Sequence, residues 1–182
     1  MEHTVARRVV EVVPYDLVWG AMFSKEETKL RQALGVEILE VHHIGSTAIP
    51  GMWAKPTIDM LVVVRDIEDV DDHNGSMSAM GYVAKGEYGI RGRRFFIKGG
   101  NRRTHHVHAF QKGSSEIARH LLFRDFIIAH PSEAARYADL KRGLAGRFES
   151  DIDSYCQGKE AFIREIDAKA AIWARSGRGR PA

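Results

Sequence analysis

The sequence has a single cysteine and no long apolar run, and both scarcities narrow what the protein can be. One cysteine, Cys156, cannot form a disulfide within the chain, and it excludes a structural zinc site built mainly from thiolates. A reducing compartment suits such a chain, so we expect a cytoplasmic protein. No stretch approaches the roughly 20 apolar residues that a membrane-spanning helix needs, and we expect no membrane partner.

The chain also has little net charge of either sign. The net charge is +3 at pH 7, which favours phosphate-containing ligands but falls short of a dedicated duplex-DNA binder. The 182 residues have the usual size of one domain, and 44% hydrophobic with 28% charged residues is typical of a globular protein. We expect one domain over residues 1–174, with a sheet core at about 9–112 and a helical part at about 115–174. A flexible basic tail is expected at 175–182.

The predicted elements run from a sheet to a group of helices, which is an α+β fold. Apolar and β-branched patterns predict strands at 9–13, 36–44, 57–64, 82–84, 95–98 and 105–110. Capping residues, prolines and glycines predict helices at 16–34, 67–80, 115–129, 131–148 and from 151 or 154 onward. Asp16 and Ser115 are the expected caps of the first and third helices. The strand at 57–64 is almost wholly apolar, as in a strand covered on both faces, and its one charge is Asp59.

A turn of small residues follows the strand at 36–44. Gly45, Ser46 and Thr47 let backbone N–H groups and two hydroxyls face an anion without obstruction, which favours phosphate. The turn is not a Walker A loop, because Gly45 and Gly51 enclose five residues and Met52 follows. Turns of this composition also serve as plain connections, so the turn alone does not establish a site.

Asp59 lies thirteen positions after Ser46, in the strand that adjoins this turn in sequence. A carboxylate on a strand beside a Gly-Ser turn is how nucleotidyltransferases hold a divalent ion against a triphosphate. The residue two positions further, on the same face of the strand, is Leu61 and not a second acid. The alternative is a structural role, in which Asp59 accepts hydrogen bonds from buried donors near Thr47.

Two histidines share one face of the predicted strand at 105–110. His106 and His108 project to one side and His105 to the other. With Asp59 they form a candidate catalytic and metal-binding group, and the expected cofactor is a divalent metal, Mg²⁺, Mn²⁺ or Zn²⁺. Zn²⁺ or Mn²⁺ suits carboxylate plus imidazole better than Mg²⁺ does. Histidines that form hydrogen bonds or contact phosphate are the alternative.

Two further patterns favour anionic partners. The segment 91–103 has six basic residues and no acidic one around Phe95 and Phe96, which indicates either RNA binding or a solvated hairpin. Three pairs in the predicted helices place a cation four residues from a ring: His120/Arg124, Tyr137/Lys141 and Tyr155/Lys159. Such pairs suit contacts with phosphates or bases, although any one of them is a common surface feature.

The stretch His43-Ile-Gly-Ser-Thr-Ala-Ile-Pro-Gly-Met-Trp-Ala-Lys-Pro-Thr-Ile-Asp-Met-Leu-Val resembles the signature of the GrpB family. The resemblance extends from about Val9 to Ile166. It includes His106-Val-His108, His120-Leu-Leu-Phe-Arg124-Asp125, His130-Pro131 to Tyr137, Leu140-Lys141, Tyr155 and Lys159-Glu-Ala-Phe162-Ile. The family is placed in the nucleotidyltransferase superfamily. The resemblance therefore implies a mixed β-sheet palm with flanking helices and a C-terminal helical segment that would roof a nucleotide.

The resemblance also implies roles for single residues. In that superfamily the Gly-Ser pair corresponds to Gly45 and Ser46, and the first catalytic carboxylate corresponds to Asp59. The second corresponds to Leu61, which cannot serve, and the strand of the third is the one with His106. The implied ligand is a nucleoside triphosphate or another phosphorylated small molecule. Contacts with it are expected from His43, Gly45, Ser46, Thr47, Lys55, His120, Arg124, Tyr137, Lys141 and Lys159.

The expected function is a metal-dependent transfer of a nucleotidyl or phosphoryl group to an acceptor that the sequence does not reveal. Positioning and charge compensation carry most of such chemistry, so loop amides, one ion and a few cations are sufficient for it. Leu61 in place of a second acid leaves another reading, a nucleotide or phosphometabolite sensor without catalysis. Association with RNA through the segment 91–103 is a third.

Overall fold

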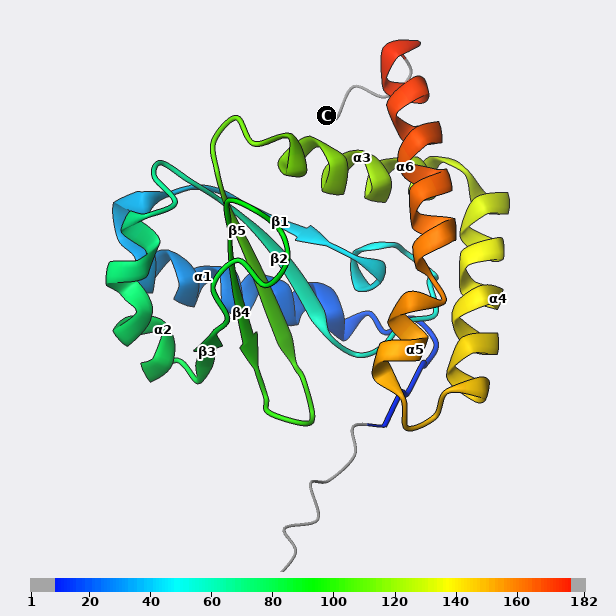
Figure 1. Ribbon diagram of the computed structural model, residues 1–182, viewed down its shortest axis with the longest axis horizontal. Helices are drawn as coiled ribbons and strands as arrows, with labels where there is room; N and C mark the ends of the chain where they lie inside the picture. The colour runs from blue at the N-terminus through cyan, green and yellow to red at the C-terminus, as the bar shows by residue number, and fades with distance from the viewer. Residues whose placement is uncertain (1–8, 178–182) are drawn as a thin grey trace, which may run out of the picture.

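The computed structural model describes residues 9–177 and contains a five-stranded mixed sheet with helices on both faces (Figure 1). The strand order is β1-β2-β5-β4-β3. The strands are β1 (Ile38–Ile44), β2 (Ile58–Val64), β3 (Tyr82–Ala84), β4 (Arg93–Lys98) and β5 (His105–Gln111). Neighbouring strands are antiparallel except β2 and β5, which are parallel. The α+β fold with a mixed sheet, predicted from the sequence, is confirmed.

The first helices cover one face of the sheet. Helix α1 (Val18–Leu34) passes behind the strands in Figure 1, and the short α2 (Asn74–Ala79) lies beside it. Alternate residues of β2, including Met60 and Val62, are fully buried against this layer together with Leu30 of α1. Alternation along a strand therefore sends Asp59 and its even-numbered partners on β5 to the opposite face.

Helix α3 (Ser115–Ala129) covers part of that opposite face. Leu61 and Phe110 are fully buried there, and Ile117 and Leu121 of α3 pack against them. The strand at 57–64 is thus buried on both faces, as its apolar pattern predicted. Asp59 is the residue of β2 that stays partly accessible.

The remaining helices, α4 (Pro131–Arg147), α5 (Ile152–Gln157) and α6 (Glu160–Arg175), stand together to one side of the sheet (Figure 1). They share a second core with the chain that follows the Gly-Ser turn. Ile49 and Met52 are buried against this group, together with Phe126 of α3 and Ile166 of α6. The turn therefore lies where the sheet meets the helical segment.

The structure corrects three predicted elements near the start and middle of the chain. Residues 9–13 form no strand; Val13 makes one isolated bridge to Ala54, and Pro14 follows it at once. The helix predicted at 67–80 is a 3₁₀ turn over 69–73 followed by the short helix α2. The cap of α3 is Ser114, whose hydroxyl accepts from the Glu116 amide, and not Ser115.

The last predicted helix is two helices, α5 and α6, separated at Gly158. A Cβ atom on Gly158 would lie 2.5 Å from Cδ2 of Leu144, so a larger residue at this corner would require the Leu144 side chain of α4 to move. Helix α6 extends to Arg175, one residue into the predicted tail, and residues 178–182 of that tail lie outside the described residues. Within residues 9–177 no helix is long and apolar enough to cross a membrane.

Candidate active site

Asp59 and two histidines meet on the sheet face that α3 partly covers. The parallel register places Asp59 beside His106 and Leu61 beside His108. The Nδ1 atom of His106 donates to Oδ1 of Asp59 at 2.9 Å, and Nε2 of His108 lies 3.6 Å from the same oxygen. The side chains are 28%, 16% and 14% exposed for Asp59, His106 and His108, so solvent reaches the carboxylate but does not surround it. His105 points to the opposite face and is buried, as predicted.

Gly45 brings the Gly-Ser turn against this carboxylate. Its φ angle of 70° lies in the left-handed region that favours glycine. A Cβ atom at this position would lie 2.5 Å from Oδ2 of Asp59. Glycine is therefore required here for two reasons, the backbone conformation and the close approach, and both serve to bring Ser46 next to Asp59.

The electrostatics of the group favour an ionised carboxylate. Burial by itself would raise the pKa of Asp59, but hydrogen bonds with His106 and His108 hold it well below its usual range. Burial lowers the pKa of His108 despite the attraction of Asp59. At neutral pH the site therefore contains a negative charge that His108 does not neutralise.

Arg93 sets the protonation of His108. This buried guanidinium donates from Nη1 to Nδ1 of His108 at 3.3 Å. Because an arginine can only donate, Nδ1 must be the accepting nitrogen, which assigns the proton of a neutral His108 to Nε2, facing Asp59. The sequence placed Arg93 in a basic hairpin and gave no signal for this role.

The three side chains can hold a divalent cation in part. One ligand atom from each of Asp59, His106 and His108 lies within 4.8 Å of the other two. Carboxylate plus imidazole matches the preferences of Zn²⁺ or Mn²⁺. Against this, Nε2 of His108 carries a proton in the arrangement that Arg93 imposes, so His108 can ligate only if Arg93 moves away. Nδ1 of His106 likewise carries the proton that it donates to Asp59, so Asp59 is the ligand that is ready, and His106 can ligate only once that proton has been displaced.

A wall of tyrosines and lysines faces the turn from the helical segment. Tyr137 of α4 is close enough to Ser46 for that side chain to act on the pKa of its hydroxyl, and its ring stacks on Phe162 of α6 with centroids 4.9 Å apart. The ammonium of Lys141 lies 4.4 Å from the centre of the Tyr137 ring. Lys141 and Tyr137 thus form the cation and ring pair that their spacing predicted.

Tyr155 of α5 gathers two more cations. The Nζ atoms of Lys55 and Lys159 lie 5.0 and 4.6 Å from the centre of its ring. Burial lowers the pKa of Lys159, and the negative charge of Asp59 acts in the opposite direction. Three predicted phosphate contacts, Lys55, Lys141 and Lys159, therefore belong to this one wall, which we call the lysine–tyrosine wall together with Tyr137 and Tyr155.

Lys141 is the most perturbed of these cations. It is 2% exposed and donates to the backbone carbonyl of Trp53. Burial, followed by repulsion from Lys159, lowers the pKa of Lys141 to about 7. Burial also raises the pKa of Tyr137 to about 12, with Ser46 acting in the opposite direction. A lysine in this state gains a favourable partner when an anion arrives.

His43, Thr47 and Arg124 brace the turn from behind. His43 forms a hydrogen bond between Nε2 and Oγ1 of Thr47 at 2.9 Å and stacks on Phe23 with centroids 4.9 Å apart. Burial lowers the pKa of His43 to about 4. Arg124 donates to the carbonyl of His43 at 3.0 Å and pairs with Asp125 at 2.7 Å. These contacts favour a supporting role over direct contact with phosphate.

His120 lies on the far side of the histidine pair. Its ring centre is 5.7 Å from that of His108, and its Nδ1 donates to the carbonyl of Glu116 at 2.7 Å. Burial lowers the pKa of His120 to about 4. Arg124 is engaged elsewhere, so the predicted pairing of His120 with Arg124 is not the contact that the structure forms.

The basic segment 91–103 has internal partners for four of its six basic residues, and one of them is Arg103, which donates to the carbonyl of Gly100 at 2.9 Å. Arg94 donates twice to Asp71, at 2.8 Å from Nε and 2.8 Å from Nη2, and Lys98 pairs with the buried Glu26 at 2.6 Å. Arg93 is buried, as described above. The sequence pattern therefore overstates the positive surface that this hairpin offers to RNA.

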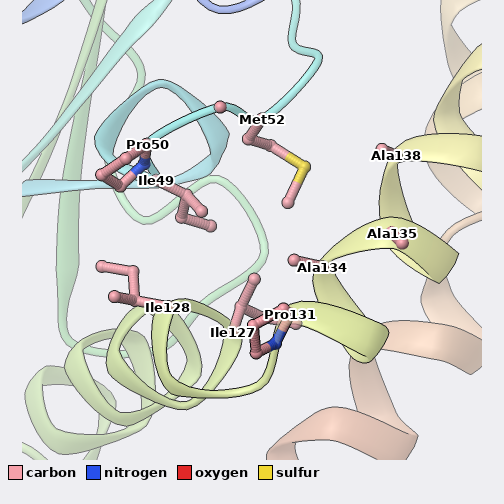
Figure 2. A pocket seen from close by; sticks show the side chains of 10 residues that line it. Ile49, Pro50, Met52, Ile127, Ile128, Pro131, Ala134, Ala135 and Ala138 are labelled. Atoms are coloured by element: carbon pink, nitrogen blue, oxygen red, sulfur yellow. The ribbon is translucent and has the colours of Figure 1, made fainter.

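A separate hollow of about 310 Å³ lies behind the turn, and Figure 2 shows the side chains that line it. It is bounded by the chain after the turn and by the facing ends of α3 and α4. The lining residues are Ile49, Pro50, Gly51, Met52, Ile127, Ile128, Pro131, Ala134, Ala135 and Ala138. No lining side chain is polar, so this hollow is not the place where a phosphate binds.

Comparison with known proteins tests the resemblance. Residues 9–169 match the family model described as GrpB protein. The chain belongs to the GrpB family. UPF0157 protein YqkA of Bacillus subtilis is 48% identical over 171 residues, which cover 94% of this chain and 50% of YqkA. The chain thus spans about half the length of that relative.

This chain covers a larger share of two further GrpB relatives. UPF0157 protein PA4798 of Pseudomonas aeruginosa is 37% identical, over 88% of this chain and 67% of PA4798. The crystal structure of conserved protein GrpB from Enterococcus faecalis superposes with a TM-score of 0.85 at 42% identity, covering 88% of this chain and 96% of that one. The fold of this chain is therefore that of a solved GrpB protein.

Proposed function

We propose that this GrpB protein binds a nucleoside triphosphate and a divalent cation, and transfers a nucleotidyl or phosphoryl group from the bound nucleotide. The phosphates lie between the Gly45–Ser46 turn and the lysine–tyrosine wall. The observation that carries the proposal is the close approach of the turn to Asp59, where a Cβ atom on Gly45 would lie 2.5 Å from Oδ2 of the carboxylate, beside three cations that the rings of Tyr137 and Tyr155 hold in place. The resemblance to nucleotidyltransferases in the sequence agrees with this placement.

Each residue of the site has a part in this proposal. Ser46 offers its hydroxyl to a phosphate oxygen, and Gly45 keeps the approach free of a side chain. Lys55, Lys141 and Lys159 compensate the charge of the phosphates, which is most of what phosphoryl transfer asks of a protein. The rings of Tyr137 and Tyr155 hold these ammonium groups in place, so phosphate binding costs less side-chain entropy.

Asp59 would hold the cation, with His106 as a second ligand once its Nδ1 has lost the proton that it donates to Asp59, and His108 as a third once Arg93 has moved away. A divalent ion there would neutralise charge that builds on the transferring group and align it for in-line displacement. Asp59 also fixes the orientation of His106 through their 2.9 Å hydrogen bond. The same carboxylate thus serves binding and alignment.

A second candidate function is a nucleotide or phosphometabolite sensor that does not turn its ligand over. One observation favours it: Leu61 stands where a second catalytic acid is expected, and it is fully buried against Ile44 and Phe110. The space beside Asp59 is therefore built for an apolar side chain. Such a sensor binds phosphate at the same site but does not transfer the nucleotidyl or phosphoryl group.

One experiment separates the two functions. The four ribonucleoside triphosphates are titrated with Mg²⁺, Mn²⁺ or Zn²⁺ by calorimetry, and pyrophosphate and phosphate release are followed in parallel. Binding with release supports the transferase, and binding without release supports the sensor. Asp59→Asn and Ser46→Ala should weaken binding in both cases, and undiminished affinity in both variants would show that the site lies elsewhere.

A further inference from the structure

An exposed aromatic ring stands beside the candidate site without a part in the function proposed above. Tyr88, in the loop between β3 and β4, is 66% exposed and stacks on Phe95 with centroids 5.3 Å apart. Phe95 in turn contacts the rings of His106 and His108 at 5.4 and 4.9 Å. A ladder of rings therefore runs from the surface to the imidazoles beside Asp59.

The backbone of Tyr88 is held in an unfavourable conformation. Its φ angle is 45°, and within residues 9–177 it is the one residue other than glycine with a positive φ. That conformation costs a side chain about 1–2 kcal/mol, so contacts must maintain it. Arg93 supplies them by donating to the carbonyls of Tyr88 at 2.7 Å and Glu87 at 3.1 Å. The guanidinium that contacts His108 therefore also fixes the exposed ring.

The surroundings of Tyr88 suit a flat ring joined to an anion. Lys85 and Arg91 are exposed on the same loop, while the carboxylate of Glu87 accepts from the Gly92 amide at 2.6 Å. Every nucleobase has a π-face that stacks on an aromatic side chain, and a stacked base is worth about 1–3 kcal/mol. A nucleobase matches the ring, and a base that also carries a phosphate, as in RNA, matches the neighbouring cations as well.

The position of Tyr88 indicates which substrate its ring would meet. In the sheet order β1-β2-β5-β4-β3, the Gly-Ser turn follows β1, whereas Tyr88 leans on β4. Asp59 of β2 and the histidines of β5 lie between them. A triphosphate at Ser46 and a base at Tyr88 would approach Asp59 from opposite sides, as a donor and an acceptor do.

We propose that Tyr88 is the stacking platform for a nucleobase of the acceptor, which is either a free nucleoside or the end of a single-stranded RNA. The assignment of this base to an acceptor rests on the proposed transferase function. The binding of the base does not rest on that function, because a base stacks on the ring of Tyr88 whether or not a group is transferred.

The test compares Tyr88→Ala, Tyr88→Gly and Tyr88→Phe with the wild type. Adenosine and a tetra-adenylate RNA are the two probes, measured at millimolar concentrations by ligand-detected NMR without nucleotide or metal. Tripolyphosphate with Mn²⁺ serves as the probe of the phosphate site. The glycine variant removes the ring and relieves the backbone strain, which separates loss of stacking from distortion of the loop.

We expect the alanine and glycine variants to bind adenosine or the RNA about 5- to 160-fold more weakly, from the worth of one stacked base. The phenylalanine variant should match the wild type, and tripolyphosphate affinity should not change. The probe that responds identifies the acceptor as nucleoside or RNA. Binding that persists in both variants without the ring, or no binding of either probe to the wild type, would overturn the platform. Failure of tripolyphosphate to bind would instead overturn the proposed function.

Discussion

The buried lysine of the lysine–tyrosine wall gives the most quantitative prediction. Lys141 has a pKa of about 7 in the folded protein and about 10.5 when unfolded. Between these values the unfolded chain holds more protons than the folded one, so this residue makes the free energy of unfolding rise with pH. One pKa unit corresponds to about 1.4 kcal/mol, and the interval from pH 7 to 9.5 therefore contributes roughly 3 kcal/mol.

The perturbation is Lys141→Met, which keeps the length of the side chain and removes its proton. The variant lacks the contribution of Lys141. The free energy of unfolding of the variant minus that of the wild type should therefore be roughly 3 kcal/mol more positive at pH 7 than at pH 9.5. Urea denaturation of both proteins at the two pH values measures this difference. Lys25→Met, on the exposed face of α1, controls for the loss of any lysine. Equal pH dependence in the wild type and Lys141→Met would refute the reasoning.

Three other predictions concern the turn and its neighbours. Gly45→Ala should lower the free energy of unfolding, in the same urea assay, by more than the roughly 1–2 kcal/mol that a left-handed backbone costs a side chain. Gly51→Ala is the control, because Gly51 has a φ of 74° and no atom within 4 Å of an added Cβ, and it should show the backbone cost alone. Tyr137→Phe keeps the stacked ring and should cost about 1 kcal/mol through its lost interaction with Ser46; a double-mutant cycle with Ser46→Ala should show that coupling. Triphosphate binding at pH 8 should take up a proton at Lys141, visible as a calorimetric heat that depends on the buffer and absent in Lys141→Met.

The sequence predicted the sheet well because its strands have strong patterns. The apolar run at 57–64 and the paired histidines at 105–110 became the parallel strands β2 and β5. The weaker patterns were misread, since Val9–Val13 has no neighbouring strand to pair with beyond a single bridge. The break at Gly158 depends on how closely α5 approaches Leu144, which is a tertiary contact that no local pattern shows.

The candidate site was predicted in outline but not in its detail. Asp59, His106 and His108 do converge, because strand alternation places them on one face. The sequence could not show that Arg93 contacts His108, since the two are fifteen positions apart and lie in a hairpin that reads as basic surface. Nor could it show that Lys141 is buried and donates to the Trp53 carbonyl, or that His43 supports the turn through Thr47, because both depend on packing between the sheet and the helical segment.

The central claim is that nucleotide phosphates bind between the Gly45–Ser46 turn and the lysine–tyrosine wall. Calorimetric titration of tripolyphosphate in the presence of Mn²⁺ tests it most directly, in the wild type, Ser46→Ala and Lys159→Met, with Lys25→Met as the surface control. We predict binding to the wild type and the control, and at least severalfold weaker binding in the other two. No binding to the wild type, or equal affinity in all four proteins, would contradict the claim.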